Sequence, residues 1–452
     1  MKKHKLLLST THIIMLSFLS AIVIGSLLLS LPISSADGKS VGYIDALFTS
    51  TTATCVTGLV TLPTVTAWGI FGQVVILVLI QIGGLGIITI MSGIMIFLHK
   101  RLGINDRILL QDAFNLNSQS GLLSFVKKVI SGTLIVEGVG ALLYMTVFIP
   151  QYGAKGIWIS VFNSISAFCN AGIDIISENS LCDYATNPII NITTCLLIIS
   201  GGLGYVVWWD LIRVFKKIKT AGIKCFKHLT LQSKIVLFST VILIFFGGAV
   251  ILFFEYDNPL TIKDMSLFDK IQVSLFQSVT TRTAGFATVP QQNLSNGASL
   301  TSLLLMFIGG SPVGTAGGIK TVTIAVLVAS AISTVRGKNE VVLFNRNISK
   351  AAISKAIAVI STSFFIMFSS TLLLTAVTDA SVLDVVYETV SATATVGLTR
   401  NLTPLLDIAG KIIIICTMYL GRIGPISLAI AFNIKKQKPD IIKNPTEEIS
   451  VG

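Results

Sequence analysis

Four short segments that each end in a glycine recur along the chain at nearly constant spacing. Their glycines, Gly58, Gly172, Gly285 and Gly397, lie 114, 113 and 112 residues apart. Glycine lets the backbone turn its carbonyl groups without a Cβ clash, and rings of backbone carbonyls replace the water shell of a dehydrated cation in ion filters. The spacing therefore predicts four equivalent loops around one axis, with their carbonyl oxygens directed at a cation.

We expect the last three residues of each segment to carry these ligands. The fourth segment ends in Thr-Val-Gly, the tripeptide that opens a potassium-channel filter, whereas the second ends in Asn-Ala-Gly. The ring is therefore pseudo-symmetric, and selectivity is expected to concentrate at the glycine layer. The predicted ion-binding residues are Val56, Thr57, Gly58, Asn170, Ala171, Gly172, Thr283, Ala284, Gly285, Thr395, Val396 and Gly397.

A second glycine-rich motif follows each of these segments. Small residues in membrane helices usually allow close helix packing, which is our interpretation of most of its glycines, including Gly83, Gly86, Gly201 and Gly204. The four copies are Gln81–Gly86, Ser200–Gly204, Ile308–Ser311 and Leu420–Gly424.

The third copy is expanded and holds five glycines and one proline within residues 309–318. This composition unwinds a helix. Its position after the third glycine segment favours a flexible gate below the loops, with a passive kink as the alternative. The predicted gate residues are Gly309, Gly310, Ser311, Gly314, Thr315, Gly317 and Gly318, together with Arg422.

Arg422 stands where the other three copies of the motif have glycine. Arginine within a membrane span is costly and usually faces a partner or a water-filled cavity. Two interpretations stay open: an electrostatic barrier in the ion pathway, or a pairing with a carboxylate such as Glu137 or with loop carbonyls. For Arg282, beside the third glycine, we expect a structural pin, for example to Glu388.

The composition indicates a membrane protein. Of 452 residues, 52% are hydrophobic and only 12% are charged, whereas about a quarter of residues are charged in soluble proteins. The first uncharged stretch is too long for the apolar core of a secretory signal, so we interpret it as a permanent span. A membrane span needs about 20 residues. Four stretches without Asp, Glu, Lys or Arg reach or exceed this length: 6–36, 184–209, 235–254 and 356–378.

The net charge of +12 is concentrated in five clusters that hold 24 of the 33 Lys and Arg residues. Acidic or neutral segments separate the clusters, which disfavours a single nucleic-acid patch. The positive-inside rule places the clusters in the cytoplasm, and this implies eight complete spans with both termini inside. The clusters are 2–5, 100–128, 213–234, 336–355 and 435–443.

Each repeat is predicted to contain an outer helix, a short apolar helix, a glycine loop and an inner helix. The short elements are about half as long as a span, so they must enter the membrane and turn back. This predicts an all-α membrane protein with eight transmembrane helices and four re-entrant pore loops around a pseudo-fourfold axis. The expected boundaries are 1–98, 99–219, 220–336 and 337–434 for the repeats and 435–452 for a cytoplasmic C-terminal tail.

The expected short helices are 45–53, 160–167, 270–279 and 384–392, and the expected inner helices are 71–98, 186–212, 300–335 and 408–433. Asp45 and Asp384 each lie thirteen residues before a glycine and are predicted to cap their short helices. Helices that run inward place negative C-terminal ends at the membrane centre, which favours a cation there.

These elements together resemble the Trk/Ktr/HKT superfamily of potassium transporters, most closely its bacterial KtrB or KtrD type of membrane subunit. The resemblance covers essentially the whole chain. It rests on Asp45–Thr49, Val56–Leu59, Gln81–Gly86, Arg282–Phe286, Gly317–Lys320, Thr395–Leu398, Gly421–Pro425 and Pro445–Gly452.

The resemblance implies potassium-selective uptake, with a potassium ion at the four filter glycines, a loop gate matching 309–318 and a pore-lining arginine matching Arg422. It implies a homodimer in the bacterial cytoplasmic membrane, whose cytoplasmic face binds a ring of nucleotide-binding regulatory subunits. The cytoplasmic segments of this chain are too short for a nucleotide-binding domain, so a separate protein must bind any nucleotide, and we expect no cofactor on the chain itself. In plant relatives a serine at the first filter glycine accompanies sodium transport.

Two other functional classes are less favoured. A sodium-coupled secondary carrier with alternating access would also have internal repeats and broken helices, but only Glu137 among carboxylates lies clearly within a predicted span. An enzyme is disfavoured because the spans hold no Ser-His or paired-Asp constellation. The six cysteines show neither CxxC nor His-Cys spacing, so they predict no metal site and no disulfide framework.

Overall fold

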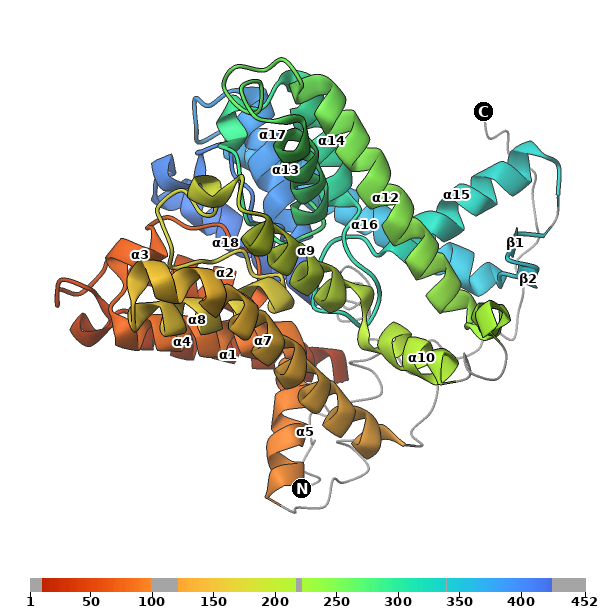
Figure 1. The fold of residues 1–452 in the computed structure, drawn as a ribbon, viewed down its shortest axis with the longest axis horizontal. Helices are drawn as coiled ribbons and strands as arrows, with labels where there is room; N and C mark the ends of the chain where they lie inside the picture. Colours follow the sequence, from red (N-terminus) through yellow and green to blue (C-terminus); the bar gives the residue numbers. More distant parts are fainter. Residues whose placement is uncertain (1–9, 99–120, 217–221, 339, 425–452) are drawn as a thin grey trace, which may run out of the picture.

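The computed structural model describes residues 10–98, 121–216, 222–338 and 340–424. The predicted tail 435–452, the basic clusters 2–5 and 435–443, and most of the cluster 100–128 therefore lie outside the described residues. Within the described residues, strands are confined to a hairpin of β1 (Val342–Leu343) and β2 (Arg346–Asn347). Nearly all other regular structure is helical (Figure 1).

The helices follow one order four times: a long outer helix, a short helix and an inner helix. The outer helices are α1 (Thr10–Leu29), α7 (Leu122–Tyr152), α12 (Leu231–Glu255) and α16 (Lys350–Thr375). The short helices are α2 (Tyr43–Cys55), α8 (Lys155–Cys169), α13 (Leu267–Thr280) and α17 (Val382–Ala394). The connections hold α3 (Thr64–Ala67) and the 3-10 turns η1 (Pro32–Ser34), η2 (Cys182–Tyr184), η3 (Gly222–His228), η4 (Gln291–Asn293) and η5 (Thr403–Leu405).

The outer helices have the length and apolarity of membrane spans. Among the described residues, four helices can cross a bilayer by these two criteria, or up to six if each sharply bent helix pair counts as one span. Large apolar side chains lie exposed along them, including Leu142 of α7, Phe253 of α12 and Phe365 of α16. Such continuous exposure is unfavourable in water and is expected where lipid covers the surface.

The first two inner helices are broken, so our expectation of continuous helices over 71–98 and 186–212 was wrong, whereas the unwinding expected in the third at 309–318 is confirmed. The first comprises α4 (Ile70–Leu85) and α5 (Ile87–Phe97), and the second comprises α9 (Pro188–Leu203) and α10 (Tyr205–Phe215) with a bend of 98°. Gly86 and Gly204 lie at the breaks with φ of +83° and +87°, a backbone conformation that glycine tolerates and that a helix cannot contain. The third consists of α14 (Asn296–Phe307), a loop and α15 (Thr321–Val335).

The fourth inner helix, α18 (Ile408–Ile423), ends in the same way, at Gly424 with φ of +87°. The continuation predicted to residue 433 lies outside the described residues. In Figure 1, α15 runs away from the other inner helices toward the β1–β2 hairpin.

The outer helix and the short helix of each repeat are joined at equivalent points. Hydroxyl groups of the first three short helices donate to outer-helix carbonyls: Ser50 to Ile22 (2.7 Å), Ser164 to Glu137 (2.6 Å) and Ser278 to Ile244 (2.9 Å). In the fourth repeat the hydroxyls of Thr371 and Thr389 bond each other (2.8 Å). These recurring contacts fix each short helix at one depth beside its outer helix.

The predicted capping role of Asp45 and Asp384 was wrong, because both lie in the first turn of their helices. Gly42 precedes α2, and the Ser381 hydroxyl caps α17 by accepting the Asp384 amide (3.2 Å). The two carboxylates instead pair with cations of other segments, Asp45 with Lys411 (2.6 Å) and Asp384 with Arg400 (2.7 Å). A carboxylate in the first turn still interacts favourably with the positive N-terminal end of the helix dipole.

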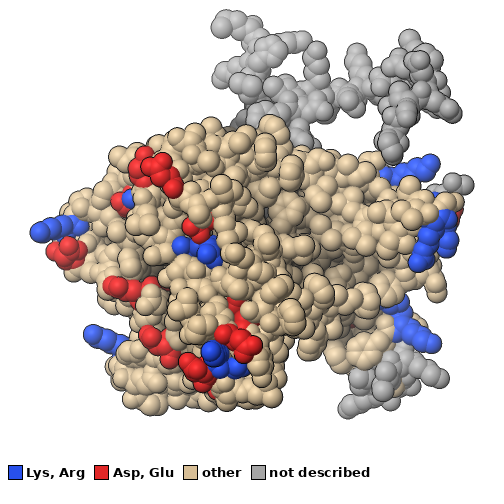
Figure 2. All heavy atoms as spheres, turned by 90° about the horizontal axis from the view of Figure 1, so that it is seen from above, with Lys and Arg blue, Asp and Glu red and all other residues tan. Residues whose placement is uncertain are grey.

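Charged side chains are unevenly distributed over the face shown in Figure 2. Lys and Arg gather at one end of the molecule, and Asp and Glu lie mainly on the opposite half with a few Lys and Arg among them. The broad surface between them is almost free of charge, which is the distribution expected around a lipid-covered belt.

Candidate functional site

The four predicted glycines converge on one point and form a closed ring. Their φ angles are all positive, at +103°, +64°, +83° and +98° in chain order. A Cβ added to any of them would strike the carbonyl oxygen of the residue that precedes the next glycine in the ring. These oxygens belong to Ala171 beside Gly58, Ala284 beside Gly172, Val396 beside Gly285 and Thr57 beside Gly397.

The ring forms because each chain segment reverses its direction at the same register. The residue two positions before each glycine has a left-handed backbone, with φ between +52° and +66°. Non-glycine residues rarely adopt this conformation, and four occurrences in one register indicate a shared constraint. They are Val56, Asn170, Thr283 and Thr395. The sequence offered no signal for this feature, since Val, Asn and Thr have no common left-handed preference.

Short-helix hydroxyl groups hold each loop from behind. The Thr52 hydroxyl accepts the Gly58 amide (2.9 Å), and the Ser391 hydroxyl accepts the Gly397 amide (3.0 Å). In the second and third repeats the hydroxyl donates to the residue after the glycine, from Ser166 to the Ile173 carbonyl (2.5 Å) and from Thr280 to the Phe286 carbonyl (2.6 Å). The backbone of each segment is thus bonded to its own short helix.

The carbonyl oxygens of the segments are left free by this arrangement. Among the hydrogen bonds within residues 10–98, 121–216, 222–338 and 340–424, none ends on a backbone oxygen of the twelve predicted ion-binding residues. Most of these residues are fully buried in the protein. Buried carbonyl groups without a donor are rare unless water or an ion satisfies them.

The short helices add a negative potential at the ring. α2, α8 and α17 end directly before the left-handed residue of their segments, and α13 ends three residues before it. The C-terminal ends of the four helices therefore approach one site, and each carries a partial negative charge from its dipole. Carbonyl ligands and helix dipoles together make the ring suited to a cation.

The loop between α14 and α15, residues 308–320, packs against the second repeat. The Ser311 amide donates to the Gly202 carbonyl (2.9 Å) and the Thr315 amide to the Gly201 carbonyl (3.1 Å). The Tyr205 amide, at the start of α10, donates to the Val313 carbonyl (3.0 Å). The loop is thus bonded to the break in the second inner helix.

The same loop reaches two of the glycine segments. The Gly317 amide donates to the Thr283 hydroxyl (3.1 Å), and a Cβ at Gly317 would collide with the side chain of Thr395. The Thr315 hydroxyl donates to the carbonyl of Phe168 at the end of α8 (3.0 Å). Because it contacts three repeats, the loop lies across the space next to the ring.

Arg422 bonds carbonyl groups rather than a carboxylate. Its Nη1 donates to the carbonyl oxygen of Thr315 in the loop (2.9 Å), and its Nη2 donates to that of Gly83 in the last turn of α4. Of the pairings left open by the sequence, the structure therefore has the loop carbonyls and not Glu137. Lys320, the last residue of the Gly317–Lys320 motif, donates from Nζ to the Ala316 carbonyl (2.7 Å).

One glycine in three copies of the second motif serves close packing, whereas the packing role expected of Gly86 and Gly204 was wrong, because they lie at the helix breaks. A Cβ on Gly83, Gly201 or Gly421 would strike a carbonyl in the last turn of the short helix in the same repeat. The struck carbonyls belong to Thr54, Phe168 and Thr393. Gly309, the third-repeat equivalent, instead packs on Gly317 of its own loop, so the expanded copy replaces helix packing with a folded loop.

The expected pairing of Arg282 with Glu388 was wrong. The Arg282 guanidinium donates to the Thr240 hydroxyl of α12 (3.3 Å), so it does bind the third loop to its own outer helix. The Glu388 carboxylate accepts the hydroxyls of Thr399 (2.7 Å) and Thr403 in the loop after the fourth glycine. Local hydroxyl donors were available to Glu388, and sequence spacing does not show them.

A model of the TrkH family, described as cation transport protein, matches residues 6–443. The chain belongs to this family. It is accordingly a membrane transport protein and not an enzyme.

Several relatives match over almost their full length. The chain is 40% identical to the Ktr system potassium uptake protein B of Bacillus subtilis, covering 98% of this chain and 96% of the relative. It is 36% identical to the potassium/sodium uptake protein NtpJ of Enterococcus hirae, covering 98% of each. The fold is similar to the crystal structure of the potassium transporter TrkH from Vibrio parahaemolyticus, with a TM-score of 0.75, 16% identity and coverage of 96% of this chain and 86% of that one.

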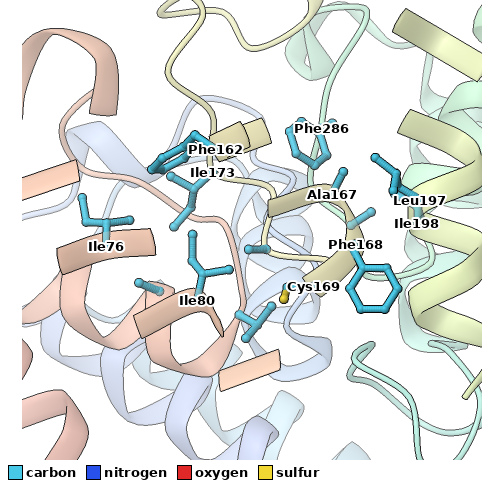
Figure 3. Close-up of a cluster of buried hydrophobic side chains, with 14 of the residues drawn as sticks. Ile76, Ile80, Phe162, Ala167, Phe168, Cys169, Ile173, Leu197, Ile198 and Phe286 are labelled. Carbon is cyan, nitrogen blue, oxygen red and sulfur yellow. The ribbon is translucent and has the colours of Figure 1, made fainter. Parts of the chain in front are cut away.

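Figure 3 shows how this transporter surrounds one segment with apolar side chains. Side chains of α8 lie between Ile76 and Ile80 of α4 on one side and Leu197 and Ile198 of α9 on the other. Cys169 lies on the side of α8 that faces Ile80, whereas Phe168 points away from it. A close-packed interior of this kind resists deformation, which holds the second segment in its register.

Proposed function

We propose that this transporter mediates potassium-selective uptake through a pore formed by the single chain, with the glycine ring as its selectivity filter. Potassium loses its water shell and is coordinated by the backbone oxygens of Val56–Gly58, 170–172, 283–285 and 395–397. The single observation that carries this proposal is the set of twelve buried backbone oxygens that no donor of the described residues reaches. Carbonyl rings of this kind are the ligands of potassium filters.

The 308–320 loop acts as the gate, and the bonded arrangement corresponds to a closed gate. The loop contacts the segments of the third and fourth repeats through Gly317. Arg422 holds the loop through Thr315 and places a positive charge near the pathway, which opposes the passage of a cation. Opening then requires the loop to leave Gly201, Gly202 and Arg422.

The transporter works in the bacterial cytoplasmic membrane as a homodimer, with both termini and the basic end of Figure 2 in the cytoplasm. The gate is regulated by a separate cytoplasmic ring of nucleotide-binding subunits. Support comes from relatives that are named as components of a Ktr system and from the positive-inside rule.

A sodium-coupled carrier is the alternative. The name of the Enterococcus hirae relative includes sodium as well as potassium, which keeps sodium as a second ion to be tested. Glu137, the buried carboxylate of α7, bonds Gln81 (3.2 Å) and belongs to the packing behind the loops rather than to the ring. The ring itself therefore favours a continuous pore over a carboxylate-based coupling site.

Rescue of a potassium-uptake-deficient bacterium on limiting potassium tests the proposal. The wild-type chain should restore growth, with or without a co-expressed nucleotide-binding subunit. When sodium is added, potassium uptake should show no fixed ratio of sodium ions to potassium ions. Failure of the wild type in both settings, despite its presence in the membrane, would overturn potassium uptake. A fixed sodium-to-potassium ratio would favour the carrier.

A further inference from the structure

One repeat carries a carboxyl group at a position where the other repeats have none. The carbonyl of Glu137 accepts the Ser164 hydroxyl of α8, as those of Ile22 and Ile244 accept their short-helix serines. In the fourth repeat Thr371 makes the corresponding contact. Glu137 is only 4% exposed. Because a carboxyl within a span is costly and tends to be retained for function, this departure from the pseudo-symmetry calls for an explanation.

The Glu137 side chain joins three elements. Gln81 of α4 donates from Nε2 to Glu137 Oε2 (3.2 Å), and the Cys169 thiol of α8 donates to Glu137 Oε1 (3.9 Å). The same thiol also donates to Gln81 Oε1 (3.4 Å). Cys169 directly precedes the second glycine segment and faces α4 in Figure 3. The three side chains therefore form one buried polar cluster at the seam between the first and second repeats.

This cluster lies next to an anchor of the gate. Gln81 is two residues before Gly83 in the last turn of α4, and the Gly83 carbonyl accepts Arg422 Nη2. Arg422 in turn holds the Thr315 carbonyl of the loop. A chain of contacts thus leads from Glu137 through Gln81 and the end of α4 to Arg422 and the loop.

A second residue of α7 supports the other anchor of the loop. Thr133 is four residues before Glu137 and therefore on the same face of the helix. The Thr133 hydroxyl donates to the Tyr205 hydroxyl (3.5 Å). The Tyr205 amide in turn donates to the Val313 carbonyl of the loop. One face of α7 is thus connected to two of the contacts that hold the loop.

We propose that Glu137 is a positioning residue for the closed gate: by fixing Gln81, it holds the last turn of α4 where the Gly83 carbonyl can bind Arg422. This inference rests on the gate role proposed for the 308–320 loop. Without the carboxyl group, Gln81 keeps only the weak contact with the Cys169 thiol (3.4 Å). The turn that ends at Gly86 is then less firmly held, and Arg422 keeps only its contact with Thr315.

The test is a double-mutant cycle on potassium flux into liposomes that contain the full chain alone. Glu137→Ile installs the residue found at the equivalent position in the first and third repeats, and Glu137→Gln keeps an oxygen that accepts from Gln81. Arg422→Ala removes the downstream partner. Gly138→Ala, next to Glu137 on α7, is the control, because a Cβ at Gly138 meets nothing within 4 Å.

We expect Glu137→Ile to raise basal flux about five-fold, the size of effect that results from losing one hydrogen bond inside the protein, with the potassium-to-sodium preference unchanged. Glu137→Gln and Gly138→Ala should stay within about two-fold of wild type. In the Arg422→Ala background, Glu137→Ile should add nothing further, because both changes act on the same contact.

Unchanged flux in Glu137→Ile, or effects of Glu137→Ile and Arg422→Ala that multiply, would overturn the positioning role. If Glu137→Ile does not reach the membrane, Gln81→Leu breaks the same contact from α4 and carries the same expectations. If the wild type conducts potassium but Arg422→Ala shows no higher flux than the wild type, the gate role of the loop and this inference are both overturned, while potassium transport itself stands. Absence of wild-type flux would instead contradict the proposed function.

Discussion

Arg422 and Thr315 lie 107 positions apart in the chain and are joined by a hydrogen bond of 2.9 Å from the guanidinium to the loop carbonyl. The bond links the end of the fourth inner helix to the loop that interrupts the third. A hydrogen bond from a charged donor is stronger than one from a neutral donor. This contact therefore stabilises the position of the loop.

Arg422→Ala is expected to raise steady-state potassium flux at least about ten-fold, because it removes hydrogen bonds from a charged group that contribute about 1.5–3 kcal/mol each. Lys411→Met, on the same helix α18, removes the ion pair with Asp45 and no contact to the loop. It should leave flux near wild type. Radioactive rubidium uptake into liposomes measures both, and equal flux in the two variants would contradict a role for Arg422 in closure.

Gly317→Ala tests the fit of the loop against the fourth segment. The added methyl group would overlap the Thr395 side chain, so the loop must shift and the closed state is destabilised. We expect higher basal flux. Gly138→Ala is the control, since a Cβ at this position of α7 meets nothing within 4 Å. A basal flux in Gly317→Ala as low as in the wild type would show that the closed position of the loop does not depend on this fit.

Ser391→Ala tests the support behind the fourth segment. It leaves the buried Gly397 amide without its acceptor at 3.0 Å, which costs about 1–3 kcal/mol of stability. The segment that ends in Gly397 can then adopt other conformations. The potassium-to-sodium permeability ratio should fall while total flux persists. Thr362→Val, which removes an exposed hydroxyl of α16, should not alter the ratio. An unchanged ratio in Ser391→Ala would mean that this hydroxyl does not maintain the filter geometry.

Arg400→Ala is expected to lower stability rather than selectivity. The guanidinium pairs with Asp384 (2.7 Å) and donates to the Gln291 carbonyl (3.0 Å) and the Ser299 hydroxyl (2.8 Å), so it joins the third and fourth repeats. Its loss should cost about 2 kcal/mol and lower the melting temperature in detergent. Arg213→Ala, which breaks an ion pair of an exposed arginine, should cost at most about 1 kcal/mol. Equal melting temperatures would contradict the joining role.

The convergence of the four glycines was predictable because repeat spacing survives in the sequence as a count of residues. The left-handed residues Val56 and Thr395 were not, since their conformation is imposed by the ring and not by their side chains. The contact of Lys320 with the Ala316 carbonyl was not predictable either, because it depends on the path of a loop. The pairings of Arg282 and Glu388 were wrong for the same physical reason: hydroxyl partners brought close by the fold leave no trace in spacing.

The breaks at Gly86 and Gly204 illustrate a different difficulty. Glycine within a membrane helix serves close packing at some positions and interrupts the helix at others. Gly83 and Gly86 belong to one motif, yet Gly83 packs on Thr54 within α4 and Gly86 ends the helix with φ of +83°. Composition alone does not separate the two uses, because each depends on the neighbours that the tertiary fold places beside the glycine.

The most direct test of the glycine ring as a potassium filter is the potassium-to-sodium permeability ratio of the purified chain in liposomes, compared between wild type and Gly58→Ser. A side chain at Gly58 would lie 2.6 Å from the Ala171 carbonyl and strain a residue with φ of +103°. Gly42→Ala is the control, because a Cβ at this position before α2 would make only an ordinary contact with the Asp45 carboxylate (3.7 Å). We predict potassium preference in the wild type and control and its loss in Gly58→Ser. An unchanged ratio and flux in Gly58→Ser would contradict the central claim.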